Sequence, residues 1–216
     1  MPAQQEQSLT ARTIQKTLDW AYDKAIYGIP GLGTAEDLAN DYLKADGALD
    51  KKVNSLIRWQ NTKSATAGFA TGLGGLFTLP VAIPADIAST IYIQIKMVAA
   101  IAIMYGIDVR DDKVRTLVYL CLVSSTTKDL LSQFGLKAGG RVFMQSLRKI
   151  PASVIVKINQ KVGIRLLARF GRRGIFKLGR LAPFVGGFIN ATFDFLSTRA
   201  IARVAKRTFK ELSANS

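Results

Sequence analysis

Residues 65–107 read ATAGFATGLGGLFTLPVAIPADIASTIYIQIKMVAAIAIMYGI, and Asp86 and Lys96 are the only charged residues among them. A stretch this apolar is expected to be buried, either in a protein core or in a bilayer. Its first half is long enough to cross a bilayer as a helix, but glycines weaken a helix there, and Pro80 and Pro84 interrupt it. We therefore predict a central, buried helical hairpin over residues 66–106, with membrane insertion as the alternative.

Helical periodicity continues on both sides of this hairpin. Ile14, Leu18, Ala21 and Ala25, for example, recur at the spacing of one helical face. No run shows the sustained alternation of a strand bounded by hairpin turns. The sequence predicts an all-α protein: a single compact helical domain of about seven to eight helices around the buried apolar Gly/Pro-rich hairpin. We expect residues 1–46 to be an N-terminal helical extension and residues 47–212 to be the main helical domain.

The composition excludes several kinds of catalytic site. The chain of 216 residues has no histidine and one cysteine, which removes the commonest general base, the usual zinc ligand and every His-containing triad. We therefore predict neither a metal nor a cofactor. Cys121 lies on an apolar helical face and is expected to be an inert packing residue in a reducing compartment. The stretch MPAQQEQSLT lacks the basic and apolar regions of a signal peptide, so none is expected.

Two predicted helices carry polar rows on otherwise apolar surfaces. Asp86, Thr90 and Gln94 follow one another at four-residue spacing, and so do Asn190, Asp194 and Thr198. We predict that both rows face a common polar interior. Asp86 has a structural alternative as a helix cap, and Asp194 as the ion-pair partner of an arginine. The functional alternative is that these carboxylates bind a cation or move a proton.

The net charge of +15 resides in the second part of the chain. Residues 1–129 contain 13 acidic and 13 basic side chains, whereas the remaining 87 residues contain 17 basic and two acidic ones. A block with one sign of charge favours an anionic partner, such as lipid headgroups, nucleic acid or an acidic protein. A solvated face balanced by acidic residues of the first part is the structural alternative.

Part of this charge forms a row on one predicted helix. Four basic residues occur at four-residue intervals, which rotates the row by only about 120° along the helix. One further arginine falls inside that arc, and another extends the surface from the last helix. We predict that the following six residues bind an anionic surface: Lys157, Lys161, Arg165, Arg169, Arg172 and Arg203.

The order of several motifs resembles that of the bacterial EcsC family. The matching segments are residues 67–75, residues 79–86 with Gln94 and Ala102, residues 105–108, and Gly186-Gly187-Phe188-Ile189-Asn190 with Asp194. The family is named for a companion of an ABC transporter. The resemblance implies a bacterial protein of the cytoplasm or of the inner membrane surface, and it places Asp86, Asn190 and Asp194 among the motif positions. It supplies no catalytic residue.

Three function classes follow from these observations. The leading prediction is a non-enzymatic module peripheral to the inner face of the cytoplasmic membrane, which docks on anionic lipid or on a membrane transport complex through its basic half. The first alternative is an enzyme or cation-binding protein that uses Asp86 and Asp194. The second is a nucleic-acid-binding protein, which the charge favours, although no recognised binding motif is present.

Overall fold

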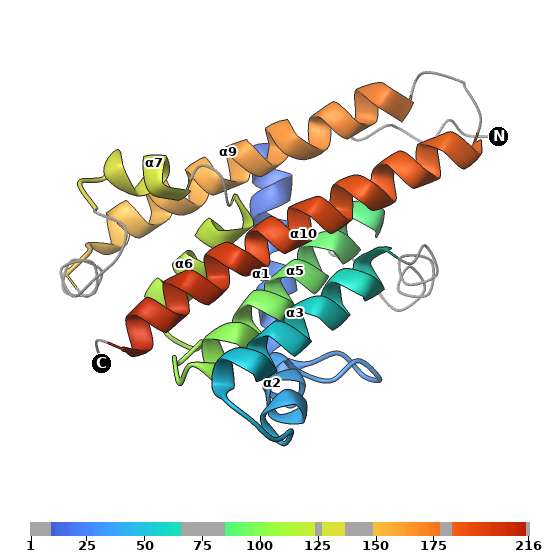
Figure 1. Ribbon diagram of the computed structural model, residues 1–216. Coiled ribbons are helices and arrows are strands. Elements are labelled where there is room, and N and C mark those ends of the chain that lie inside the picture. The colour runs from blue at the N-terminus through green and yellow to red at the C-terminus, as the bar shows by residue number, and fades with distance from the viewer. Residues whose placement is uncertain (1–9, 66–84, 124–126, 137–148, 178–182, 215–216) are drawn as a thin grey trace.

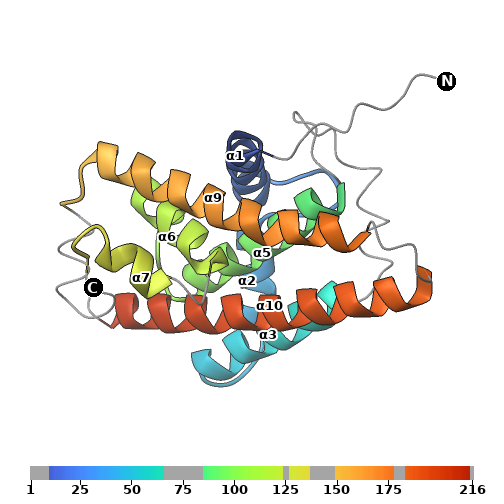
Figure 2. The ribbon, with the colours of Figure 1, turned by 90° about the horizontal axis from the view of Figure 1, so that it is seen from above.

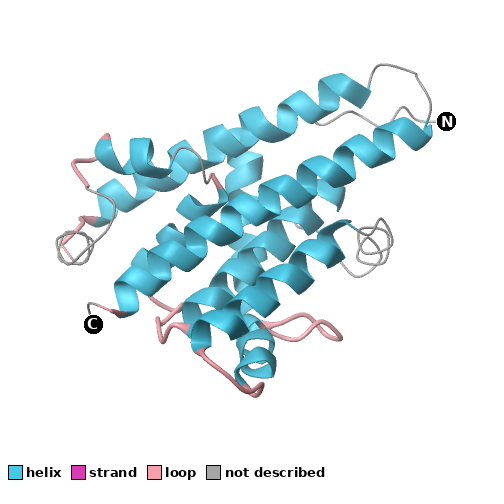
Figure 3. Ribbon diagram, viewed as in Figure 1, coloured by secondary structure: helices cyan, strands magenta, loops and turns pink. Residues whose placement is uncertain are grey.

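The computed structural model describes residues 10–65, 85–123, 127–136, 149–177 and 183–214 (Figure 1). Side chains are described over the same ranges except for residues 61–65, 85–86, 127–129, 171–177 and 183–196. All regular structure in these ranges is α-helical (Figure 3). The helices are α1 (Ala11–Tyr27), α2 (Ala35–Leu43), α3 (Leu49–Ala65), α5 (Ala85–Met104), α6 (Asp112–Leu122), α7 (Thr127–Ser132), α9 (Ala152–Lys177) and α10 (Pro183–Ser213). The predicted all-α class is confirmed, and the eight described helices agree with the expected number.

Helix α5 lies at the centre and packs against α1, α2, α3, α6 and α10. Its apolar side chains are almost all buried, including Ile91, Ile95, Val98 and Ile101. Among the described residues, one segment, Ile87–Met104, has the length and composition of a membrane span, and 78% of it is buried by the rest of the protein. A buried core helix passes the same test, so this segment alone is weak evidence for a membrane span. The other half of the predicted hairpin, residues 66–84, lies outside the described residues.

Helix α1 belongs to the same core as α5. Thr10 caps its N-terminus by accepting a hydrogen bond from the Thr13 amide at 3.1 Å. Its apolar stripe, which includes Ile14 and Leu18, is fully buried, and the helix packs against α5 and α9. The segment expected as an N-terminal extension therefore shares the core of the following domain.

Helix α2 is fixed by its own cap and by a lysine of α5. Thr34 and Asp37 form a reciprocal capping box, in which the Asp37 carboxylate accepts from the Thr34 amide at 2.8 Å. These hydrogen bonds hold the pKa of Asp37 below its usual value. Lys96 donates to the carbonyl oxygens of Leu32 and Gly33 in the turn before α2. One of the two charges in the apolar stretch thus has a structural role.

The C-terminal parts of α5 and α10 meet the beginning of α3 at Asp50. The Asp50 carboxylate accepts a hydrogen bond from the Tyr105 hydroxyl at 2.9 Å and one from Lys210 at 2.5 Å, and Lys206 lies 3.7 Å away. Hydrogen bonds from Lys210 and then Tyr105 are the largest causes that lower the pKa of Asp50. One carboxylate thus connects three helices that are distant in the sequence.

This arrangement predicts a pH-dependent contribution to stability. A carboxylate whose pKa is lower in the folded protein stabilises the fold above its unfolded pKa of about 3.9, and this stabilisation is lost as pH falls through the folded pKa. Because the side chain of Asp50 is 42% exposed, we expect Asp50→Asn to lower the free energy of unfolding by only about 1 kcal/mol at pH 7. Urea unfolding from pH 7 to pH 2 should show the two proteins converging below pH 4. A difference in the free energy of unfolding that stays constant from pH 7 to pH 2 would contradict a lowered pKa of Asp50 in the folded protein.

Candidate functional site

The two predicted polar rows meet where α5 packs against α10. The buried Gln94 donates from Nε2 to the Thr198 hydroxyl at 3.2 Å and to the Ser197 hydroxyl at 3.4 Å. Gln94 and Thr198 are each only 1% exposed, and Thr90 is half-buried one turn before Gln94. A polar contact therefore exists inside the apolar interface of these helices, at one position of the two rows.

The remaining positions of the rows are related by the helix register. Helices α5 and α10 run in the same direction, since Gln94 contacts Thr198 and the C-terminal parts of both helices reach Asp50. At about 1.5 Å per residue, this register places residue 86 level with residue 190, and residue 90 level with residue 194. The side chains of Asp86, Asn190 and Asp194 lie outside the described ones. Their convergence on one site stays a prediction.

Other polar features of the described residues offer no metal site. No group of three or more His, Cys, Asp or Glu side chains there is arranged to hold a metal ion. Cys121 is buried, and this burial raises the pKa of its thiol to about 12. The thiol is therefore protonated at neutral pH, which agrees with a packing role.

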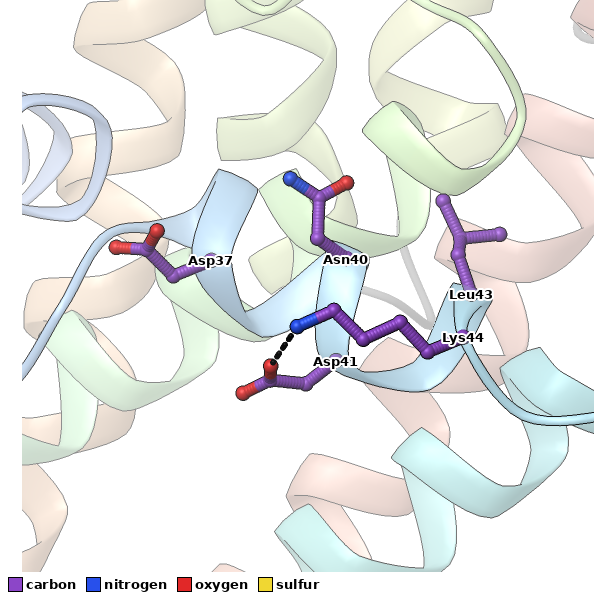
Figure 4. A pocket seen from close by; sticks show the side chains of 5 residues that line it. All are labelled: Asp37, Asn40, Asp41, Leu43 and Lys44. Atoms are coloured by element: carbon purple, nitrogen blue, oxygen red, sulfur yellow. Dashed lines mark hydrogen bonds and ion pairs between the residues drawn. The ribbon is translucent and has the colours of Figure 1, made fainter.

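A surface hollow of about 460 Å³ lies beside α2 (Figure 4). Its lining residues are Asp37, Asn40, Asp41, Leu43 and Lys44. The Asp37 carboxylate is engaged in the capping box, and Lys44 forms an exposed ion pair with Asp41 at 3.4 Å. Because these charges already serve the local structure, the hollow has no feature of a binding site.

The exposed side of α9 combines cationic and apolar side chains. Lys157 and Lys161 are exposed, as are Val156 and Ile164, at 53% and 56%. At about 100° per residue these four residues share an arc of about 140°. Only four large apolar side chains are prominently exposed among the described ones, and two of them lie here. Lys161 also donates to the Gln133 side chain at 2.6 Å, which ties this edge to the end of α7.

The other residues of the predicted anion-binding set lie in different surroundings. Arg165 and Arg169 are half-buried. Arg169 donates to the Leu122 carbonyl at 2.9 Å, where a cation is favoured by the negative end of the α6 dipole. The side chain of Arg172 lies outside the described ones, and Arg203 is exposed on α10. In both views α10 lies between α9 and α3 (Figures 1 and 2), so Arg203 belongs to a different row from Lys157 and Lys161.

A polar cluster around Arg115, which joins α6 to α1, was not predicted from the sequence. Arg115 of α6 donates to the hydroxyl of Tyr119 at 2.9 Å and lies 3.4 Å from Asp19 and 3.2 Å from Asp23 of α1. Its guanidinium also stacks on Tyr22, 4.8 Å from the ring centroid. The only sequence signal was the four-residue spacing of Asp19 and Asp23 and of Arg115 and Tyr119. Nothing in that spacing indicates that the two pairs meet.

The model of the EcsC protein family matches residues 36–211. This chain belongs to the EcsC family. The resemblance found in the motifs is thereby confirmed. No curated protein and no solved structure matches the chain.

The EcsC match begins within α2 and ends near the end of α10. It therefore includes both polar rows and the whole of α9. Helix α1 of this EcsC protein lies before the match, although it packs against α5 and α9. Family membership establishes the kind of domain.

Proposed function

We propose that this EcsC family protein is a non-enzymatic module that docks on anionic membrane surfaces through the exposed side of α9. The observation that carries the proposal is the mixture of Val156 and Ile164 with Lys157 and Lys161 on one exposed face. A helix that rests on a membrane presents apolar side chains to the acyl boundary and lysines to the headgroups.

The charge distribution supports the same orientation. Helix α9 contains seven basic and no acidic side chains, whereas α2 contains three acidic and no basic ones. These helices lie on opposite sides of the molecule, α9 at the top and α2 at the bottom of Figure 1. The negative potential of an anionic bilayer attracts the first side and repels the second. Docking through α9 therefore also turns α2 away from the membrane.

The expected affinity is moderate and depends on both kinds of side chain. A basic residue close to an anionic bilayer contributes about 1 kcal/mol. Partial burial of Val156 and Ile164 adds on the order of 1 kcal/mol each. Such binding is reversible and sensitive to salt, because exposed charges are screened over about 8 Å at physiological ionic strength. The proposed location is the inner face of the cytoplasmic membrane, on lipid or beside a membrane transport complex.

Flotation with liposomes tests this proposal. Vesicles of phosphatidylcholine with 30% phosphatidylglycerol should bind the protein, and pure phosphatidylcholine vesicles should not. We expect Lys157→Glu/Lys161→Glu to weaken binding at least about 30-fold, since two favourable contacts of about 1 kcal/mol are replaced by repulsion. The matched control is Lys24→Glu/Lys51→Glu, which makes the same charge change at exposed positions of α1 and α3. The control variant should bind nearly as well as the natural chain.

A second variant separates apolar contact from electrostatic attraction. Val156→Ser/Ile164→Ser leaves every charge in place, so its binding should fall about 30-fold while the salt dependence is retained. Equal loss in the Lys24/Lys51 control would mean that only net charge matters, and the α9 assignment would fail. Equal binding to neutral and anionic vesicles would also contradict it. Tight binding to DNA or RNA without vesicle binding would identify a different polyanion.

A further inference from the structure

A second cationic surface lies on α10, where it borders α3. Arg199, Arg203, Lys206 and Lys210 fall within an arc of about 60° on one side of α10. Lys206 and Lys210 show that this side faces α3, because Lys206 donates to Asn54 at 2.9 Å and Lys210 to Asp50 at 2.5 Å. The C-terminal end of the row thus consists of two lysines that have oxygen partners on the neighbouring helix.

The partners of this row change along the interface. The two hydrogen bonds show that α3 and α10 are antiparallel, so residues whose numbers sum to about 260 lie at the same level. Asp50 and Asn54 face the lysines, but half-buried Ile57 is level with Arg203. Arg199 and Arg203 are exposed and have no ion pair with any carboxylate whose side chain is described. The cationic row therefore continues past Asn54 to the level of Ile57, and the α3 side chains beyond Gln60 lie outside the described ones.

A third arginine lies at the same level. Arg58 is exposed on α3, and the antiparallel register places it level with residues 202 and 203 of α10. Its guanidinium donates to the Ser55 hydroxyl at 3.1 Å, one turn earlier on the solvent side of α3. Arg199 and Arg203 are four residues apart, or about 6 Å along α10. Exposed arginines of two adjacent helices therefore lie at nearly the same level along the α3–α10 interface.

We infer that Arg199, Arg203 and Arg58 form a binding site for a phosphate monoester group. The guanidinium fork donates two parallel hydrogen bonds to phosphate oxygens, which an ammonium cannot do. Three such groups from two helices match the several oxygens and the double negative charge of a terminal phosphate. The surface differs from the α9 face, because no large apolar side chain among the described ones of α10 is prominently exposed and the exposed apolar residue beside Arg58 is aromatic, Trp59.

This site is independent of the proposed docking through α9. Its ligand has two possible sources with the same chemistry: the terminal phosphate of an anionic lipid such as phosphatidic acid, or a soluble phosphate ester. Inorganic phosphate tests the shared chemistry. Vesicles of phosphatidic acid, compared with phosphatidylglycerol vesicles of equal surface charge, test the lipid source, because phosphatidylglycerol has only a phosphodiester.

Titration calorimetry of the full chain with inorganic phosphate is the first measurement. We expect binding that Arg199→Gln/Arg203→Gln weakens at least tenfold. Arg199→Lys/Arg203→Lys keeps the charge but loses the forked donors, so it should recover only part of the affinity. A control for the loss of one arginine from the same helix is Arg207→Gln, one turn beyond Arg203, where the arginine is paired with Glu211 at 3.0 Å. This control should bind phosphate normally.

The vesicle experiment uses Lys157→Glu/Lys161→Glu to remove docking through α9. A preference for phosphatidic acid that persists in this variant and disappears with Arg199→Gln/Arg203→Gln would support the site and assign the lipid source. Phosphate binding without that preference would support the site and assign the soluble source. The inference is overturned if phosphate binding and the lipid preference are both absent, if they are insensitive to the arginine variants, or if only an oligonucleotide binds.

Discussion

Arg115→Met is expected to lower the free energy of unfolding by about 3 kcal/mol. The Arg115 side chain is only 25% exposed and connects α6 to α1 through Tyr119, Asp19 and Asp23. Methionine preserves most of the aliphatic packing but removes every donor. The buried hydroxyl of Tyr119, whose pKa is raised chiefly by burial, then loses one partner, and two neighbouring carboxylates lose their counterion. Removing one member of a partly buried charge cluster has effects of this size.

Arg110→Met provides the control for this prediction. Arg110 lies in the same part of the chain, but its ion pair with Glu36 is 3.7 Å long and both side chains are more than half exposed. Surface pairs of this kind contribute at most about 1 kcal/mol. Urea unfolding of both variants at pH 7 distinguishes the two environments. Similar losses in the two variants would show that the Arg115 cluster stabilises no more than a surface pair does.

Gly163→Leu is expected to be destabilising by 3 kcal/mol or more, on the order of the largest overpacking effects. Gly163 is buried where α9 crosses α1. A Cβ atom added there would lie 3.4 Å from the Ala11 carbonyl oxygen and 3.5 Å from the Gln15 side chain. The further carbons of leucine would occupy the space of the α1 backbone, which cannot rotate away. Helices α1 and α9 would have to separate.

Gly163→Ala is the corresponding control. Its single added carbon meets its neighbours at ordinary contact distance, and alanine is favoured over glycine within a helix by about 1 kcal/mol. We therefore expect the alanine variant to be as stable as the natural chain or slightly more stable. Thermal unfolding followed by circular dichroism would test both substitutions. A large loss of stability with alanine would show that the two helices tolerate no atom at this crossing.

The sequence predicted the kind of elements well because the helical signals are local. The recurrence of Ile14, Leu18 and Ala21 on one face of α1 and the apolar character of α5 are each contained in a few neighbouring residues. The central position of α5 also followed from its lack of charge, since only burial on nearly all sides stabilises such a helix. The structure bears out these features in the described residues.

Features that depend on contacts between distant helices were harder to predict. Arg169 was grouped with the surface lysines because periodicity places residues on a helix without showing what lies beside them. Its bond to the Leu122 carbonyl depends on where α6 ends. The boundary expected after residue 46 set α1 apart, yet α1 packs against two helices that come much later in the chain.

The candidate sites were predicted only in part, because spacing along one helix does not show which side chains of another helix lie beside it. The two polar rows were recognised by their spacing, and the Gln94–Thr198 contact gives one point at which they meet. The basic residues were also recognised, but not their division between α9 and α10. The exposure of Val156 and Ile164 was not predicted, because aliphatic residues within a helical sequence are usually assigned to the core.

The packing of α10 against α5 and its contact with Asp50 are completed late in the synthesis of the protein. Helix α10 is made after the other described helices, and it supplies buried residues, including Ile201, Ala205 and Phe209, to the core around α5. At about 5–20 residues per second, a ribosome takes roughly 5–20 s to extend the chain from the end of α5 to Lys210. During that interval the most apolar helix lacks its α10 neighbour. A chaperone that binds nascent chains has this period in which to shield α5 from aggregation.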